Sequence, residues 1–512
     1  MSENGKKAIL GSAALLFALS LLNKGLGFVK SMVIASAFGA NLQTDAYYVA
    51  EGLMQNALIP ISEAMAVSFL PVYIGIREKD RNDANVFTSR TMTDIFLLAF
   101  VLSGLLYVLS PLILKIMLPS YAPEEVAMSV SYFRILIWGM CFYMSNQLLQ
   151  SLLNAEKQYG YSSFTAMLNN LILTGAVFFL GKRYGLWTMA AAVVFSYVAQ
   201  YLFLQMRSWR YGNLTWRHGF RDSRIRKLCM QALPIFFGNA ICELNNLVDR
   251  SLLSGMEEGA VTAVSYASVL YQFASNLIGI PMTTIIYTEL AESFAGGHKK
   301  EGGAKLEKGI QISLFFCIPI SLLIMVSANL IVQITYGRGA FDAEAVGMTA
   351  QGLTYYGLCF LAYCINALLF RACYSLNDTA LPMKVGLGTV SLNIILSIVL
   401  SRFLGLRGIV LATAIANSLT TVITMVIFNR TKLTIHLRRF IKPAVGIVFS
   451  SVAATAVCTA WLIVTPAVNG IVRFIVAACL EFGIYAILVL LCRNETGLEI
   501  VSLLWSVVKR KL

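Results

Sequence analysis

The sequence predicts an all-α polytopic membrane protein with fourteen transmembrane helices. The chain is 58% hydrophobic and only 13% charged, and its mean hydropathy is +0.72. A soluble chain of this length would form several domains with far more charge. Apolar runs long enough to cross a bilayer recur along the whole chain. Basic residues gather in alternate connections between the runs, which is a signal of membrane topology.

Each predicted span is an apolar run separated from the next by a short connection. Several runs exceed the roughly 20 residues needed to cross, so we expect tilted or protruding helices. The first run is too long for a cleavable signal peptide and lacks a small-residue cleavage site. The runs cover residues 8–37, 45–75, 88–118, 125–153, 160–182, 186–206, 227–255, 260–294, 304–333, 345–374, 378–401, 407–428, 441–465 and 468–491.

Lysine and arginine set the expected orientation. One set of connections is basic, and it includes Lys6, Lys7, Arg77, Lys79, Arg81, Lys157 and the segments 207–227, 299–308, 430–442 and 493–511. The alternate connections are short and often acidic, apart from two basic corners at Lys182-Arg183 and at Arg402 with Arg407. The positive-inside rule therefore places both termini in the cytoplasm.

Two sequence offsets indicate an internal repeat. Gly185-Leu186 and Gly405-Leu406 are 220 residues apart, and a span follows each pair. Ala46, Ala50, Leu53 and Gln55 match Ala263, Ala267, Leu270 and Gln272 at an offset of 217. We infer two parallel six-helix repeats plus two C-terminal helices, because an even number of spans keeps both halves in the same orientation.

The repeat defines the expected domains. They are an N-terminal six-helix half over 1–206, a cytoplasmic linker over 207–226, a C-terminal six-helix half over 227–430, an additional helix pair over 431–491 and a cytoplasmic amphipathic tail over 492–512. The tail mixes apolar side chains with Lys509-Arg510-Lys511 and is typical of an interfacial helix.

The first span carries a cation at its centre. Lys24 lies about 24 Å from one end of the span and about 20 Å from the other, at 1.5 Å per residue. A cation at that depth costs roughly 2.5–3.5 kcal/mol on insertion scales. Gly25 and Gly27 flank it and weaken the helix. We interpret Lys24 as facing a water-filled cavity that receives an anion. For Lys30, closer to the end of the span, snorkelling to water is an equally good explanation.

Polar side chains at helical spacing also mark the second, seventh and eighth spans. Because spans 1 and 2 are the repeat mates of spans 7 and 8, their polar faces should converge on the interface between the halves. Transporters built from two repeats bind substrate at that interface. Hydrogen bonding between helices explains single polar residues but not so many charges. The expected substrate-binding residues are Lys24, Lys30, Asp45, Glu51, Gln55, Asn239, Glu243, Asn246, Arg250 and Gln272. Asp249 beside Arg250 also fits a structural ion pair.

Several motifs resemble the MurJ/MviN family of lipid II flippases, part of a group that includes multidrug extruders and polysaccharide flippases. The first span has the pattern Lys-x-x-Gly-Phe-x-Lys and ends with Phe38-Gly39-Ala40 followed by Thr44-Asp45-Ala46-Tyr47. Phe69-Leu70-Pro71-Val72-Tyr73, Ala232-Leu233-Pro234 and Val248-Asp249-Arg250 also fit. The resemblance covers the whole chain, including the additional final helix pair.

The resemblance implies export of an undecaprenyl-diphosphate-linked precursor by alternating access. Cavity cations would grip the diphosphate, and the last two helices would hold the lipid tail. Lys24 and Lys30 stand where the family usually has arginines, and lysines bind a diphosphate as point charges. The arginines typical of spans 2 and 8 are absent, with Leu58-Ile59-Pro60 and Ala267-Ser268-Val269 in their places.

We therefore expect a transporter that flips lipid II, without enzymatic activity. The alternatives are a flippase for another polyprenyl-linked polysaccharide and an ion-coupled multidrug extruder, which the acidic residues keep open. A glycan polymerase would need a substantial outer loop, and every outer loop is short.

The expected partners are the lipid-linked glycan and membrane lipids, with no nucleic acid and a monomeric state. No metal or cofactor is expected, since the three histidines lie in connections. Sodium or the membrane potential is a candidate for coupling, with Asp249 and Asn393 as sodium ligands.

Overall fold

The computed structural model is helical, with no strand in the ranges that it describes. It describes residues 3–211, 219, 222–295, 298–376, 378–431, 438–494 and 497–498. Most of the expected tail over 492–512 and about half of the expected linker over 207–226 lie outside these ranges. The all-α fold class is confirmed.

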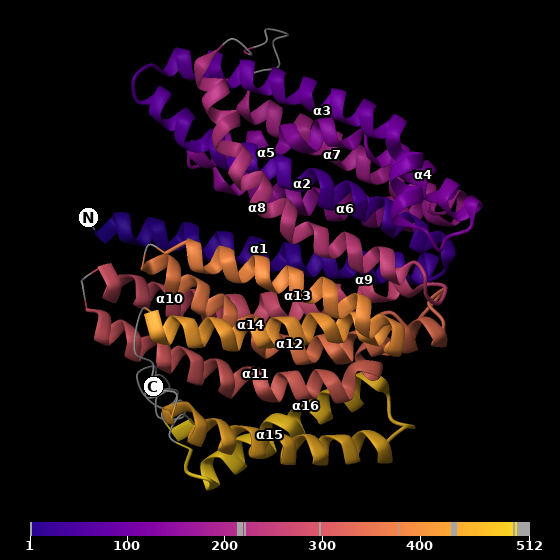
Figure 1. The fold of residues 1–512 in the computed structure, drawn as a ribbon, viewed down its shortest axis with the longest axis vertical. Helices are drawn as coiled ribbons and strands as arrows, with labels where there is room; N and C mark the ends of the chain where they lie inside the picture. The colour runs from indigo at the N-terminus through magenta and orange to yellow at the C-terminus, as the bar shows by residue number, and fades with distance from the viewer. Residues whose placement is uncertain are drawn as a thin grey trace. The chain divides into compact units, whose positions relative to one another are not determined.

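In these described ranges, sixteen α-helices and one π-helical turn follow one another (Figure 1). They are α1 (Glu3–Phe38), α2 (Leu42–Arg77), α3 (Arg81–Met117), α4 (Pro123–Leu136), α5 (Gly139–Ala155), α6 (Tyr159–Tyr184), α7 (Trp187–Ser208), α8 (Ser223–Leu253), α9 (Ala260–Ala274), η1 (Ser275–Gly279), α10 (Ile280–Ala295), α11 (Lys299–Thr335), α12 (Ala343–Ser375), α13 (Ala380–Leu404), α14 (Leu406–Thr431), α15 (Arg438–Val464) and α16 (Gly470–Leu491).

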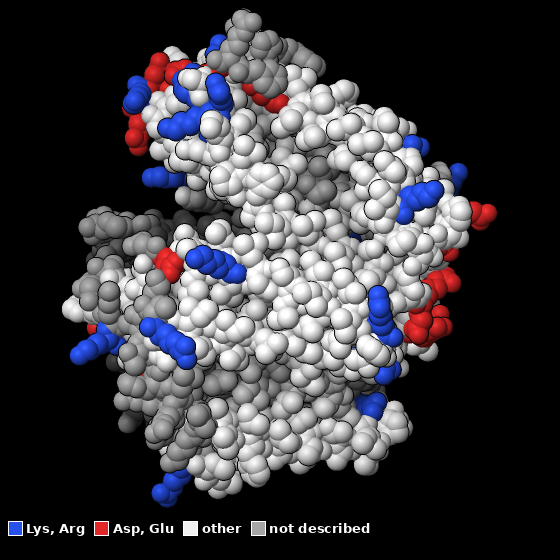
Figure 2. All heavy atoms as spheres, in the orientation of Figure 1, with Lys and Arg blue, Asp and Glu red and all other residues white. Residues whose placement is uncertain are grey.

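The protein is a multi-pass membrane protein. Eleven of the described helices are long and apolar enough to cross a membrane, and the count is twelve if the bent pair α4–α5 forms one span. The predicted fourteen also include α8 and the α9–η1–α10 run, which carry more polar residues or are interrupted. On the face shown in Figure 2, charged side chains gather mostly towards the helix ends, and the surface between them is uncharged.

The predicted fourth span, 125–153, is two helices that meet at a bend of 44°. At the bend the Ile137 carbonyl accepts from the Met140 N–H at 3.1 Å and from the Ser103 hydroxyl at 3.0 Å. Gly139 follows the bend, and a Cβ there would meet the Tyr197 ring at 3.0 Å. A glycine and one hydroxyl thus make a break in the helix tolerable inside the membrane.

The described chain divides into two compact units. The first contains residues 1–262 and 339–341, and the second contains residues 263–338 and 342–512. Helix α8, which we expected to open the second half, groups with the first unit because it packs along α2. The predicted halves over 1–206 and 227–430 remain a prediction from the repeat.

In the first unit, α2 is the central helix and packs against α3, α4, α5 and α8. Its buried face carries Tyr47, Met54, Phe69 and Tyr73, all essentially inaccessible to solvent. Helix α1 packs against α6, which in turn packs against α7. The large side chains fix α2 in place, so its polar residues take up defined positions.

In the second unit, the final helices α15 and α16 pack against each other and against α11 (Figure 1). The Tyr485 hydroxyl donates to the Phe315 carbonyl at 2.8 Å, inside a cluster with Ile447 and Val489. A separate cluster around Leu290, Leu306 and Leu368 joins α10, α11 and α12. The additional helix pair is therefore built onto α11 by ordinary apolar packing.

The corner between α1 and α2 is held by a buried carboxylate. Asp45 is 2% exposed, and its oxygens accept from the backbone N–H of Gly259 at 2.9 Å and of Thr262 at 2.8 Å. The Thr262 hydroxyl donates to the same carboxylate. Asp45 thus satisfies free N–H groups where α9 begins, as capping side chains do.

Two positions in this corner require glycine, because each has a positive φ and leaves no room for a side chain. Gly39 has φ +68° and its Cα lies against the Ala340 carbonyl, while Gly259 has φ +86° and lies against the Ala40 carbonyl. Any Cβ at either position would collide with backbone atoms. The close approach of the backbones therefore requires glycine at positions 39 and 259.

The opposite end of the first unit is tied by ion pairs. Glu156, just after α5, accepts from Arg77 at 2.9 Å, from Arg81 at 3.1 Å and from the Tyr73 hydroxyl at 2.9 Å. Burial raises the pKa of the Glu156 carboxyl, but the hydrogen bonds from Arg77 and Tyr73 bring this pKa below its ordinary value. The charged carboxylate thereby joins the ends of α2 and α5.

Asp45→Ala should lower the melting temperature of the purified protein markedly. The substitution leaves three buried donors without an acceptor, and each such group costs about 1–3 kcal/mol. Asp80→Ala is the matched control, because Asp80 is an exposed cap that accepts one backbone N–H, from Asn82 at 2.8 Å. Equal melting temperatures for the two variants in detergent would contradict the capping role.

Candidate functional site

The candidate site is the polar face that α1, α2 and α8 form in the first unit. Helices α2 and α8 pack along each other, and α2 turns from α1 at the corner that Asp45 holds. These three helices correspond to the predicted spans 1, 2 and 7. The convergence that we expected of their polar faces can therefore be followed residue by residue.

Arg250 of α8 lies against the backbone of α2. Its guanidinium occupies the space where a Cβ of residue 52 would be, and this space is open because residue 52 is glycine. One guanidinium N–H donates to the Tyr48 carbonyl in the first turns of α2. Gly52 therefore admits a cation into the contact between two helices.

Glu51 is the acidic partner of this cation. The half-buried Glu51 carboxylate interacts electrostatically with Lys30 of α1 and with Arg250 of α8. The Gln55 amide, one turn further along α2, donates to Glu51 at 3.2 Å. Three helices thus contribute to one charge cluster, Lys30, Glu51 and Arg250. With one acid between two bases, the cluster keeps a net positive charge.

Lys24 is exposed, and no described residue forms an ion pair with its ammonium group. The neighbouring Asn23 is held in place, since its side-chain oxygen accepts from the Asn170 amide of α6 at 2.9 Å. Gly27 lies against the same Asn170 side chain. Helix α1 is therefore anchored to α6 on one side of Lys24, and the ammonium group remains available to a ligand.

Acidic and amide side chains occupy the part of this face further from the corner. The Asn246 amide donates to Glu243 at 2.8 Å, and the Asn239 amide lies 3.5 Å from Glu63 of α2. Glu63 and Glu243 repel each other electrostatically. The face therefore changes from net positive around Glu51 to net negative around Glu63, which is about 18 Å further along α2 at 1.5 Å per residue.

The other predicted residues lie elsewhere. Asp45 has a structural part in the corner, and a contact with substrate remains a prediction. Gln272 is exposed in the second unit, where its amide donates to Ser268 at 2.9 Å. Asp249 accepts from Asn245 at 3.3 Å. Asn393 bonds to Thr413 at 3.1 Å and to Ser397 at 2.9 Å, so its amide serves the contact between α13 and α14. The described residues contain no group of three or more His, Cys, Asp or Glu suited to a metal.

Sequence reasoning missed the tyrosines around this site. Tyr47 of α2 and Tyr197 of α7 interact electrostatically with Glu51, and Tyr143 of α5 does so with Glu63. The rings of Tyr143 and Tyr197 are 5.1 Å apart. Tyrosine in an apolar run does not signal a site by itself, because its ring packs like any aromatic. The signal was available only in the cluster of polar residues on the neighbouring helices.

This arrangement can bind an anion. Basic groups held at a protein surface of low polarity form charge-assisted hydrogen bonds, roughly twice as strong as neutral ones. Lys24 supplies a free ammonium group, and the cluster of Lys30, Glu51 and Arg250 supplies a net positive charge.

Comparison with known proteins gives consistent results. The profile of the family described as "Lipid II flippase MurJ" matches residues 34–480. A probable lipid II flippase MurJ from Buchnera aphidicola is 24% identical over 409 residues, which cover 78% of this chain and 80% of that protein.

Solved structures show the same fold. A structure described as lipid II flippase MurJ in an inward closed conformation superposes with a TM-score of 0.81 at 20% identity, covering 94% of this chain and 99% of that one. An inward-facing multidrug resistance transporter of the MATE family and MOP superfamily gives a TM-score of 0.67 at 13% identity, covering 79% and 93%.

Gly52→Ala should impair transport by displacing the Arg250 guanidinium from α2. Gly75→Ala is the matched control, because Gly75 lies on the same helix with open space around its Cα. Alanine favours a helix over glycine by roughly 0.5–1 kcal/mol, so the control should be neutral or slightly more stable. Flipping activity and melting temperature should be measured for both variants. Unchanged activity of Gly52→Ala would show that the position of Arg250 is unimportant.

Proposed function

This chain belongs to the MurJ family of lipid II flippases, whose profile covers most of its length, and we propose that it moves lipid II across the cytoplasmic membrane of a bacterium. Lipid II is the undecaprenyl-diphosphate-linked peptidoglycan precursor, and the proposed movement is from the inner to the outer leaflet by alternating access. The observation that carries the proposal is the net positive cluster of Lys30, Glu51 and Arg250 within the helices of the first unit.

The charge of the cluster suits a diphosphate. A charged group inside a membrane protein is expensive unless it is paired or faces water, and such groups often mark substrate or ion pathways. Glu51 offsets one of the two cations when no substrate is bound. A diphosphate would then compete with Glu51 for Lys30 and Arg250, which gives a site that can both bind and release an anion.

Lys24 is the proposed first contact for the diphosphate. It is exposed, and Gly25 and Gly27 follow it on α1. These glycines weaken the helix by roughly 1 kcal/mol each relative to alanine, so α1 can bend here as the site opens to either side. Lys30 and Arg250 lie closer to the α1–α2 corner and would hold the diphosphate further along the path.

The source of energy is a separate proposal. Sodium or the membrane potential is the proposed driving force, with Asp249 as a candidate sodium ligand. Asn393 is the weaker candidate because its amide already bonds to Thr413 and Ser397. We further propose that the protein works as a monomer, with both termini in the cytoplasm.

Lys24→Ala should abolish export of lipid II while the protein stays folded and inserted, because the ammonium group has no described ion-pair partner whose loss would destabilise the fold. Lys24→Arg should keep most activity, since the charge survives. Lys182→Ala, which removes an exposed lysine in the last turn of α6, is the control. The measurement is surface exposure of lipid II in cells that depend on this protein, with membrane abundance checked for each variant. Full activity of Lys24→Ala at normal abundance would place the substrate site elsewhere.

The substrate class needs its own experiment. In vesicles containing the purified protein, lipid II should reach the opposite leaflet faster than a polyprenyl-diphosphate carrying an unrelated glycan. Equal rates would favour a flippase of broader specificity, and efflux of an amphiphilic dye without lipid II transport would favour an extruder. Lys24→Ala should slow whichever diphosphate lipid is transported.

A cysteine introduced at Glu257 should react with a membrane-impermeant reagent in whole cells, and one at Lys300 should not. Both positions are exposed, and they lie on opposite sides of the predicted eighth span. The parent protein is the control, because Cys229, Cys479 and Cys492 are exposed native thiols. The reverse labelling pattern would mean that the termini are outside.

A further inference from the structure

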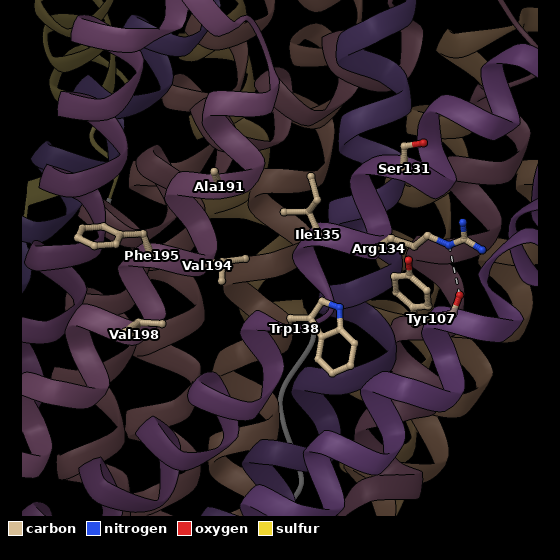
Figure 3. A pocket seen from close by; sticks show the side chains of 9 residues that line it. All are labelled: Tyr107, Ser131, Arg134, Ile135, Trp138, Ala191, Val194, Phe195 and Val198. Carbon is tan, nitrogen blue, oxygen red and sulfur yellow. Dashed lines mark hydrogen bonds between the residues drawn. The ribbon is translucent and has the colours of Figure 1, made fainter.

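A groove of about 800 Å³ lies on the first unit, away from the charge cluster. Its walls come from α3, α4, α7 and the bend between α4 and α5 (Figure 3). Arg134 and Tyr107 lie at one end, and Phe195 and Val198 lie at the other. Ile135 and Val194 lie between them. The groove is therefore amphipathic along its length.

The groove opens on a surface that faces lipid. Helix α3 beside it presents a stripe of exposed apolar side chains at helical spacing, which are Val101, Leu105, Val108, Leu112 and Ile116. In the groove itself Phe195 is 63% exposed and Trp138 is 37% exposed. Apolar surface of this extent on a membrane helix is in contact with acyl chains.

Arg134 is a cation on this surface without an acidic partner among the described residues. Its guanidinium lies 4.7 Å from the centroid of the Tyr107 ring, and its Nε donates weakly to the Tyr107 carbonyl at 3.4 Å. No described carboxylate forms an ion pair with it. Both contacts hold the guanidinium at the end of the groove and leave its terminal N–H groups for a ligand.

The Arg134 side chain extends from within the membrane towards the head groups. It lies eleven residues after Pro123, the first residue of α4, which corresponds to about 17 Å. A side chain on a helix points back towards the N-terminus, so the guanidinium reaches towards the membrane surface at which α4 begins. Trp138, one turn further into the membrane, presents a partly exposed ring to the acyl chains.

We propose that this groove binds an anionic phospholipid. The phosphate binds the terminal N–H groups of Arg134 in a bidentate, charge-assisted contact. One acyl chain lies along Ile135, Val194 and Phe195 towards Val198. The bound lipid covers the bend between α4 and α5, where the helix is interrupted and held by Ser103. The site is separate from the proposed lipid II path and does not depend on it.

Native mass spectrometry of the full-length protein with equimolar phosphatidylglycerol and phosphatidylcholine tests the head-group contact. The wild type should retain phosphatidylglycerol in preference by about fivefold, as expected for one basic residue near an anionic lipid. Arg134→Gln should remove the preference, and Arg134→Lys should keep part of it. Lys115→Gln is the matched control, because Lys115 is an exposed base in the last turn of α3 that does not line the groove. A preference that survives in Arg134→Gln, or that is absent from the wild type, would overturn the proposal.

Tryptophan fluorescence tests the acyl-chain contact. Phosphatidylglycerol with brominated chains should quench the emission that Trp138 contributes, measured as the difference between the wild type and Trp138→Phe. Ala191→Phe fills the groove without touching Arg134 and should at least halve this quenching. Unchanged quenching in Ala191→Phe would contradict the chain placement. If the mass spectra show a dimer without bound lipid, and brominated lipid then fails to quench Trp138, the groove would be assigned to a second copy of the chain.

Discussion

The buried carboxylate of Asp45 fixes the position from which the rest of the first unit is built. A buried charge is tolerated only when several donors satisfy it, and here the chain around Gly259 and Thr262 supplies them. The contact sets where α2 begins relative to the segment that follows α8. Glu51 and Gly52 lie within two turns of Asp45 on α2, and Arg250 lies close to Gly259 in the chain, so the same contact brings the cluster together. The position of the proposed binding site thus depends on a capping interaction.

This corner also bears on the internal repeat. Asp45 and Thr262 are 217 residues apart, which is the offset that relates the second and eighth spans in sequence. The predicted repeat remains an inference from the sequence, and this contact lies within the first unit. One partner is an acid and the other is a hydroxyl.

The site combines charges that would be costly singly. The Glu51 carboxylate interacts electrostatically with both Lys30 and Arg250, and the Arg250 guanidinium lies against α2 because residue 52 has no side chain. The second span lacks a basic residue at its middle, and Arg250 brings a guanidinium to that helix from α8. Arg134 is likewise held by few contacts, chiefly by the Tyr107 ring beside its guanidinium. At Arg134 the groove beside the guanidinium gives an anion a place to bind.

The sequence by itself determined the fold class, the apolar spans and the helix faces that carry polar groups, because hydropathy and helical spacing are properties of neighbouring residues. It also indicated Lys24, Glu51 and Arg250, since charges inside apolar runs stand out. The tertiary structure decided which of these residues meet. Tyr48 and Arg250 are 202 residues apart, and Asp45 and Gly259 are 214 apart, so no local pattern could pair them. Only the structure showed the capping role of Asp45, the packing of α8 against α2, the tyrosines around Glu51 and the bend in the fourth span. Each of these features depends on contacts between segments that are distant in the sequence.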